Sequence, residues 1–350
     1  MSNKNITILD IAKSVGVSKT TISRYLNGKY EYMSADTRER IKKVIEVTGF
    51  QPNKIAQSLK SQKSMLIGFV IADIESPFSS AAIKSVGNAM LGTDYNLIIA
   101  NSDNSFEREQ EYIQSLLGQQ VDGLIVNTVK MNNPALISLA NNGLPIVLLD
   151  RFVNDYKFDI SYFENDRSVT AAMNHLEEMG YSHIALCTQP HEEISPRNFR
   201  REIFLKRLKK NRVENPERFV FVEEDEELTI NNIKRLMDLS NKEGKPPAII
   251  CTNSVTLLRT VKAARTLGLR MPDDIGICGF DEWGWASELG LAGMIDVGLT
   301  TLTPSMQELG KHTAELLLRR IKRPEASKKE IAVPAQLVVR NSTRLKKENT

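Results

Sequence analysis

Short runs of apolar residues alternate with amphipathic stretches along most of the chain. The runs occupy residues 66–72, 96–100, 123–127, 145–150, 183–187, 219–222, 248–251 and 275–280. Segments with helical periodicity separate them, for example 78–92 and 106–119. Near-continuous apolar strands that alternate with helices are typical of parallel sheets covered on both faces. The strands are too many for one ordinary sheet, and a second round begins near residues 159–166, so we expect two α/β lobes.

The first fifty residues show helical spacing only. Apolar residues recur at that spacing in three segments: 7–14, 19–27 and 37–47. A residue that favours helix N-termini stands at the start of each: Thr7, Ser18 and Ser34. Gly16 lies in the short turn between the first two segments. Two short helices joined by such a turn form a helix-turn-helix signature, although a three-helix bundle with a solvated basic face would show the same spacing.

Charge is divided unevenly along the chain. The 350 residues carry a formal net charge of +3, but residues 1–63 hold 12 Lys and Arg against 5 Asp and Glu, a balance of +7. The remaining residues therefore carry −4. A basic head on a mildly acidic body indicates a polyanion as the partner of the head alone. Together with the turn spacing, this charge favours DNA binding over a solvated bundle.

The composition excludes several classes of protein. With 41% hydrophobic and 25% charged residues, the chain is neither fibrous nor wholly disordered. No apolar run approaches the roughly 20 residues that span a bilayer, and the polar start contains no signal segment. We therefore expect a cytoplasmic protein without a membrane partner. Because Cys187, Cys251 and Cys278 lie in apolar runs without paired-ligand spacing, we expect buried thiols, no metal site and no cofactor.

Polar residues on the outer face of the second helix are candidates for DNA contact. Lys19, Thr20 and Arg24 lie opposite the apolar face of a helix whose N-terminus would enter the major groove. Arg and Lys can donate to guanine, and Thr can contact a thymine methyl group, so these three residues are expected to contact base edges. Phosphate contacts, which position the head, are expected from Thr7, Ser18, Ser23 and Asn27.

Residues 51–63 join the head to the body, and they are too few to form a stable helix alone. Their apolar members Ile55, Ala56 and Leu59 share one helical face, which an ordinary linker would not need. We expect this segment to fold against a partner as a short helix capped by Asn53, with Leu59 placed between base steps in the minor groove. Asn53, Ala56 and Leu59 are its expected DNA contacts. The alternative is an interdomain linker with Leu59 packed on the body.

Three segments carry a family resemblance: ILDIAKSVGVSKTTISRYLNG, TGFQPNKIAQSLKS and IGFVIADIESPF. They resemble the lactose-repressor (LacI) family of bacterial transcription regulators, and the likeness extends from Thr7 to about Arg344. The family pairs such a head and hinge helix with a two-lobed sugar-binding body similar to periplasmic binding proteins. The resemblance therefore implies a homodimer that binds double-stranded operator DNA and a small carbohydrate effector.

In such a body the chain crosses between the lobes three times, and we place the crossings near Phe163, near Ile295 and near Pro324. The expected organisation is a helix-turn-helix head at 1–50, a hinge helix and linker at 51–63, a first lobe at 64–163 with 295–324, a second lobe at 164–294 with 325–342, and a frayed tail at 343–350. The cleft between the lobes lies at the carboxyl ends of the strands, where open α/β sheets bind ligands.

Family members carry effector contacts at a small set of strand ends. The matching positions in this chain are Phe78, Asn127, Asp150, Arg200, Asn253 and Asp281. Each residue alone could serve as a cap or turn residue, because Asn and Asp favour strand ends. Their repetition at one edge of the sheets favours a ligand.

Two departures from the family pattern concern the effector. The family often has Asn-Asp where this chain has Asn253-Ser254, and Gly-Phe where it has Ile203-Phe204. The missing acidic group lowers the negative charge near the cleft if Ser254 faces it.

Two further arginines, Arg151 and Arg197, lie near the same strand ends. Because Arg suits carboxylates, we expect both to contact an acidic sugar, as in the gluconate- and ketogluconate-responsive branch of the family. The alternative is that both arginines pair with acidic neighbours, namely Asp155, Glu192 or Glu193.

The expected function is repression of a carbohydrate-utilisation operon, relieved by a sugar or sugar acid bound between the lobes. A corepressor-dependent regulator and a regulator of another sugar are alternatives. A sugar receptor is a distant one, because it would need an export signal and no basic head. An enzyme is not expected, since the chain has no Gly-rich phosphate loop, GxSxG or HExxH. Its histidines are scattered: His175, His183, His191 and His312.

Overall fold

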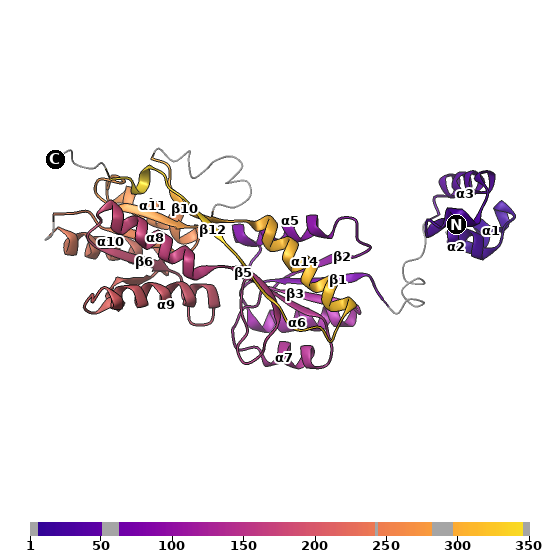
Figure 1. Ribbon diagram of the computed structural model, residues 1–350, viewed down its shortest axis with the longest axis horizontal. Helices are drawn as coiled ribbons and strands as arrows, with labels where there is room; N and C mark the ends of the chain where they lie inside the picture. The colour runs from indigo at the N-terminus through magenta and orange to yellow at the C-terminus, as the bar shows by residue number, and fades with distance from the viewer. Residues whose placement is uncertain (1–5, 51–62, 242–243, 282–296, 346–350) are drawn as a thin grey trace. The chain divides into compact units, whose positions relative to one another are not determined.

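The computed structural model describes residues 6–50, 63–241, 244–281 and 297–345. The chain divides into two compact units, a head that ends at Met65 and a body that begins at Leu66 (Figure 1). The expected hinge helix, with Asn53, Ala56 and Leu59, falls outside the described residues.

The described residues of the head form three helices and one turn of 3-10 helix. They are α1 (Ile8–Val15), α2 (Lys19–Leu26), η1 (Tyr30–Tyr32) and α3 (Ala35–Thr48). Thr7 caps α1 in a capping box with Asp10, and Ser18 caps α2 by accepting the Thr21 N–H at 3.1 Å. The core is formed by Ile11, Ala12, Val15, Ile22, Ile41 and Phe50. The three predicted helices and their caps are confirmed.

The first lobe of the body is a six-stranded parallel sheet in the order β11-β5-β4-β3-β1-β2. Its strands are β1 (Leu66–Ile71), β2 (Asn96–Asn101), β3 (Gly123–Val126), β4 (Ile146–Leu149), β5 (Asp159–Phe163) and β11 (Glu330–Val333). Apolar residues of α5 (Pro77–Met90) and α14 (Met306–Lys322) form the core on one face. Those of α6 (Phe106–Gly118) and α7 (Pro134–Asn141) form a second core on the other face.

Helix α14 lies along α5 (Figure 1). The close approach depends on Gly310, because a Cβ atom at that position would stand 2.6 Å from the backbone carbonyl carbon of Ser85. The Ser85 hydroxyl donates to the Met306 carbonyl oxygen at 2.6 Å, which ties the start of α14 to α5.

The second lobe repeats this architecture in the order β12-β10-β9-β8-β6-β7. Its strands are β6 (Ile184–Thr188), β7 (Val220–Val222), β8 (Ala248–Cys251), β9 (Gly276–Phe280), β10 (Thr300–Pro304) and β12 (Ala335–Val338), of which β12 is antiparallel to β10. The helices among its described residues are α8 (Asn165–Met179), α9 (Ser195–Lys210), α10 (Glu226–Ser240) and α11 (Ser254–Thr266), and the short turns are η2 (Pro216–Phe219) and η3 (Asn341–Thr343). The predicted α/β class with two lobes and parallel sheets is confirmed.

In each lobe the first strand lies between the second and the third, so the direction of winding reverses beside β1 and beside β6. Ligands bind outside the carboxyl ends of strands at such switch points. The topology therefore places two potential binding edges in one body.

Two of the three expected crossings between the lobes are wrong. The crossing expected near Ile295 lies between β10 and α14, because β10 pairs with β9 of the second sheet while α14 packs on the first. The crossing expected near Pro324 lies between β11 and β12, which belong to different sheets. The segment 330–333 therefore belongs to the first lobe, and 300–304 belongs to the second. The first crossing follows Phe163, where β5 ends.

The expected frayed tail does not begin at residue 343. Thr343 is fully buried and its hydroxyl lies 2.6 Å from that of Thr300 in β10. The expectation of buried thiols is confirmed, because Cys187, Cys251 and Cys278 are free and buried. None of the helices in the described ranges has the length and apolar character required to cross a membrane.

Candidate functional site

A cavity of about 330 Å³ opens where the strands of both lobes end. Its volume suits a small organic molecule. Loops after β1, β2, β3 and β4 and the last residue of β5 line it from the first lobe, and loops after β6, β8 and β9 line it from the second. The structure brings all eight predicted effector residues to this cavity: Phe78, Asn127, Asp150, Arg151, Arg197, Arg200, Asn253 and Asp281.

Two carboxylates occupy equivalent positions in the two lobes. Asp150 follows β4 and Asp281 follows β9, and both have the left-handed backbone conformation, with φ values of 62° and 78°. Asp adopts this conformation more readily than most residues, and there it ends the strand and turns the side chain into the cavity rim. The backbone N–H of Asp150 donates to the Ser161 carbonyl at 2.8 Å, and that of Asp281 donates to Leu302 at 3.1 Å.

Arg200 of α9 lies between these carboxylates and is almost fully buried. Its Nε donates to Asn165 Oδ1 at 2.8 Å, an Nη donates to the Thr252 carbonyl, and the guanidinium stacks 3.7 Å above the Phe280 ring. Burial lowers the pKa of Arg200, whereas the charges of Asp281 and Asp150 raise it. Burial also raises the pKa of Asp150, against the effect of Arg200. The group is thus a rigid polar centre with both signs of charge.

Arg151 and Arg197 form no ion pair in the described structure, although the charges of nearby acidic groups raise the pKa of each. Arg151 donates to the Thr128 carbonyl at 3.0 Å. Arg197 donates to the Pro190 carbonyl at 3.0 Å and to Gln189 Oε1 at 2.7 Å. Pairing of either arginine with Asp155, Glu192 or Glu193 was the alternative, and no such ion pair exists among the described residues.

The charges of these arginines act on one another. Burial, together with the neighbouring charges of Arg151 and Arg200, lowers the pKa of Arg197 to about 10, against the opposing charges of Glu223 and Asp73. The charged form of a guanidinium that two neighbouring cations destabilise becomes more stable when an anion binds beside it. The cavity wall therefore carries a positive patch formed by Arg151 and Arg197, neither of which forms an ion pair with an acidic side chain among the described residues.

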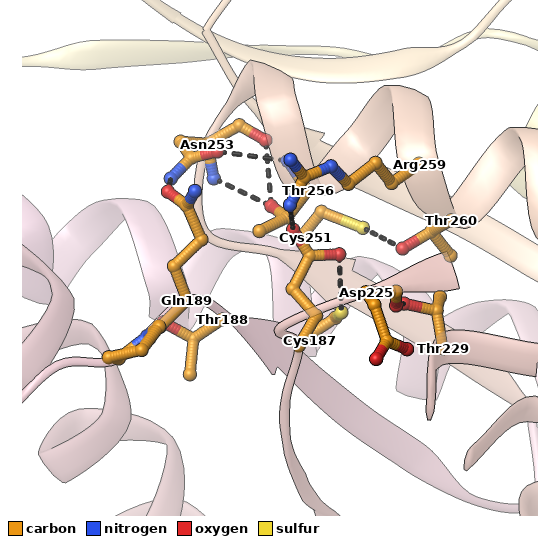
Figure 2. Close-up of polar contacts among 12 residues, drawn as sticks. Cys187, Thr188, Gln189, Asp225, Thr229, Cys251, Asn253, Thr256, Arg259 and Thr260 are labelled. Carbon is orange, nitrogen blue, oxygen red and sulfur yellow. Dashed lines mark hydrogen bonds and ion pairs between the residues drawn. The ribbon is translucent and has the colours of Figure 1, made fainter. Parts of the chain in front are cut away.

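The second-lobe rim is a polar network, drawn in Figure 2. Asn253 caps α11 by accepting the Thr256 N–H at 3.0 Å, and its Nδ2 donates to Gln189 Oε1 at 2.9 Å (Figure 2). Arg259 also lines the cavity, but its Nη1 lies 3.2 Å from Oε1 of the buried Glu223. Unlike Arg151 and Arg197, Arg259 is already neutralised.

Several lining residues were missed by the sequence reasoning. Gln189 follows β6 in the way that Asn127 follows β3, and that strand-end position was the available signal. Arg259 lies one and a half turns into α11 and no pattern in the sequence marks it. The other polar lining residues that were missed are Asp73, Glu75, Ser76, Ser79, Asn104 and Thr252.

Contacts between described residues join the lobes beside the cavity. The Met131 N–H donates to the Glu193 carbonyl at 3.2 Å, and the Phe152 N–H donates to Ser195 Oγ at 2.8 Å. The rings of Phe152 and Phe199 meet edge to face with centroids 5.5 Å apart. The cavity wall and the contact between lobes therefore share the same loops.

In the head, Lys19, Thr20 and Arg24 are exposed on α2. The Arg24 guanidinium lies over the exposed ring of Tyr32, 4.7 Å from its centroid, a contact that the sequence reasoning missed. The expected phosphate contacts are exposed except for Ser23, which is half-buried: Thr7, Ser18, Ser23 and Asn27. Asn27 uses its Nδ2 to donate to the Ser23 carbonyl at 2.7 Å.

Comparison with known proteins gives two family matches. Residues 7–53 match the model for bacterial regulatory proteins of the lacI family, and residues 173–343 match that for a periplasmic binding protein-like domain. The HTH-type transcriptional regulator KdgR of Bacillus subtilis is 34% identical over 338 residues, which cover 96% of this chain and 97% of that protein. The HTH-type transcriptional regulator PtxS of Pseudomonas aeruginosa is 30% identical over 342 residues, covering 98% and 97%.

The fold also matches a solved structure. The lac repressor dimer bound to operator and the anti-inducer ONPF superimposes with a TM-score of 0.81 at 24% identity, covering 98% of this chain and 100% of that one.

Proposed function

Because the chain belongs to the LacI family of bacterial regulatory proteins, we propose that it represses a carbohydrate-utilisation operon and that a sugar acid bound between its lobes releases it from DNA. The chain is a DNA-binding transcriptional regulator and not an enzyme. The observation that carries the effector class is the positive patch of Arg151 and Arg197, which lines the cavity without an ion pair to an acidic side chain among the described residues. The regulator acts in the cytoplasm, where its operator DNA lies.

A homodimer presents two heads to a pseudo-palindromic operator. Lys19, Thr20 and Arg24 contact base edges in the major groove. Thr7, Ser18, Ser23 and Asn27 contact phosphates, and the hinge residues Asn53, Ala56 and Leu59 contact the minor groove. Because the basic head displaces counterions from the phosphates, operator affinity falls steeply as salt concentration rises.

The effector carboxylate binds to Arg151 and Arg197, which can each offer parallel N–H donors to its two oxygens. Hydroxyl groups of the sugar bind to the polar strand ends: Asn127, Asp150, Asn253 and Asp281. Arg200 lies at the centre of these groups, and the Phe78 ring packs against the apolar edge of the ligand. Effector binding moves the lobes relative to one another and separates the two hinges of the dimer, so operator affinity falls.

Isothermal titration calorimetry with D-gluconate, 2-keto-D-gluconate, D-glucose and D-ribose tests the effector class. At least one acid should bind about tenfold or more tightly than either neutral sugar, a difference of about 1.4 kcal/mol. Arg197→Gln should remove that preference, whereas Lys206→Gln, an exposed change on the same helix, should retain it. Tight binding of a neutral sugar alone would rule out an acidic effector.

The direction of coupling is measured by operator retention with and without the bound acid. Release from DNA supports an inducer. Tighter retention would instead establish a corepressor, with the same binding site.

A further inference from the structure

Glu109 is a buried carboxylate on α6 beneath the cavity wall, and none of its surface is exposed. It accepts three hydrogen bonds from the segment 128–133: from the Val129 N–H at 2.6 Å, the Thr128 hydroxyl at 3.2 Å and Asn133 Nδ2 at 2.7 Å. Every partner is a donor, which is the arrangement that an ionised carboxylate requires. Burial raises the pKa of Glu109, while these hydrogen bonds and the Arg151 charge lower it.

The segment that Glu109 holds takes part in both the cavity and the contact between lobes. Its Thr128 carbonyl accepts the hydrogen bond from Arg151 Nη1 at 3.0 Å. Its Met131 N–H donates to the Glu193 carbonyl of the second lobe at 3.2 Å, and the Met131 carbonyl accepts the Asn154 N–H at 2.8 Å. One buried carboxylate therefore supports an arginine of the cavity wall and a bond across the cleft.

We propose that Glu109 is a positioning residue, which orients Arg151 for an anionic effector and holds the segment 128–133 against the second lobe. The proposal rests on the proposed function for the identity of the ligand. Glu109 does not touch the ligand and acts through Thr128 and Arg151. An anion that binds to Arg151 alters the hydrogen bond from Arg151 to the Thr128 carbonyl. Thr128 belongs to the segment 128–133, which also donates to the Glu193 carbonyl. Because Glu109 holds this segment, it couples effector binding to the contact between the lobes.

Glu109→Gln has nearly the same shape, but its amide group must point an N–H donor either at the Val129 N–H or at the donors Thr128 and Asn133. Either orientation breaks at least one hydrogen bond. The matched control is Glu111→Gln, an exposed change two residues further along α6. Gluconate binding is measured by calorimetry for both variants, each in the wild-type and in the Arg151→Gln background.

Glu109→Gln should weaken gluconate binding about tenfold in the wild-type background and hardly at all in the Arg151→Gln background. Glu111→Gln should leave the gluconate affinity unchanged in both backgrounds. Equal weakening in both backgrounds would show that Glu109 serves only the general structure, and no weakening would also overturn the proposal. If Glu109→Gln does not fold, Thr128→Val removes one of the three donors and should give a smaller loss with the same dependence on Arg151.

Hydrogen exchange of the ligand-free protein separates this proposal from the proposed function. The amide protons of Val129 and Met131 should lose protection in Glu109→Gln and keep it in Glu111→Gln. Unchanged protection would overturn the positioning role even if sugar acids bind. Absence of binding by every sugar acid to the wild-type protein would overturn the proposed function, and exchange would still decide the role of Glu109.

Discussion

Arg200 illustrates how one side chain can serve both the stability of the body and the proposed binding site. Its guanidinium satisfies Asn165 Oδ1 and the Thr252 carbonyl and stacks on Phe280. Arg200→Ala leaves these buried acceptors without a donor, so the free energy of unfolding should fall by about 2 kcal/mol. Operator binding should persist at temperatures where the variant is folded, while release by the effector should be lost.

Thermal unfolding measures the loss of stability. Titration of an operator complex with effector, with fluorescence anisotropy as the readout, measures the loss of release. Arg201→Ala is the matched control, because the neighbouring Arg201 pairs with Glu217 outside the cavity. Normal release of Arg200→Ala by effector would show that the cleft assignment is wrong.

The contact between Arg24 and Tyr32 in the head should affect the preference for operator DNA. Stacking of the Arg24 guanidinium over the Tyr32 ring restricts its rotamers before DNA binds. Tyr32→Leu should lower the preference for operator over random DNA severalfold, because a freely rotating Arg24 loses more entropy at a guanine. Tyr32→Phe keeps the ring and should keep the preference. Competition binding with operators selected from random DNA measures both variants, and equal losses for Leu and Phe would exclude stacking as the cause.

Among the elements, α8 and η3 are joined by a buried histidine. His175 Nε2 lies 2.8 Å from the Thr343 hydroxyl, and burial lowers the pKa of His175 below its ordinary value of 6.5. The neutral form is therefore favoured by folding. Its contribution to stability is complete above pH 6.5 and is lost as the pH falls through the lower, folded-state pKa.

Between pH 7.5 and pH 5, the free energy of unfolding should therefore fall more for the wild-type protein than for His175→Gln. The difference should not exceed about 1.4 kcal/mol per pH unit, the limit for one proton. Denaturant unfolding at both pH values measures it. His312→Gln, at a more exposed position, should behave like the wild type, and an equal pH response of His175→Gln would exclude His175 as the titrating group.

The elements that sequence reasoning predicted are those whose pattern is local. Caps such as Thr7 and Ser18 and apolar runs such as 66–72 mark their own helices and strands. Strand β10 was missed because threonines occupy three of its five positions, and the hydroxyls of Thr300 and Thr301 hydrogen-bond to Thr343 and Arg340. Strands β11 and β12 are four residues each; β11 pairs with β5, which lies 170 residues earlier in the chain, and β12 pairs with β10, which lies at least 31 residues earlier. Their assignment to lobes therefore depends on tertiary pairing, which no local pattern contains.

At the scale of the whole molecule, the binding edge was predictable because parallel strands end together. The family resemblance supplied six of the eight residues expected at that edge, Arg151 and Arg197 were added as nearby cations, and all eight line one cavity. The role of Glu109 could not be predicted, since an acidic residue on an amphipathic helix is normally exposed. Only the structure brings the segment 128–133 over it and supplies three donors.

The effector can control DNA binding only if binding to the body is energetically coupled to binding by the head. Thermodynamic linkage relates the two effects of this coupling. The factor by which a sugar acid weakens operator binding has to equal the factor by which the operator weakens acid binding. For the inducer that we propose, both should lie between about 5 and 150. Calorimetry of the acid with free and operator-bound protein gives the factor by which the operator weakens acid binding. Anisotropy of the operator with and without the acid gives the factor by which the acid weakens operator binding. Both must be measured at one salt concentration, because the basic head makes operator affinity depend on salt. Equal factors above one establish an inducer, equal factors below one a corepressor, and a factor of one would mean that the cavity does not regulate the head.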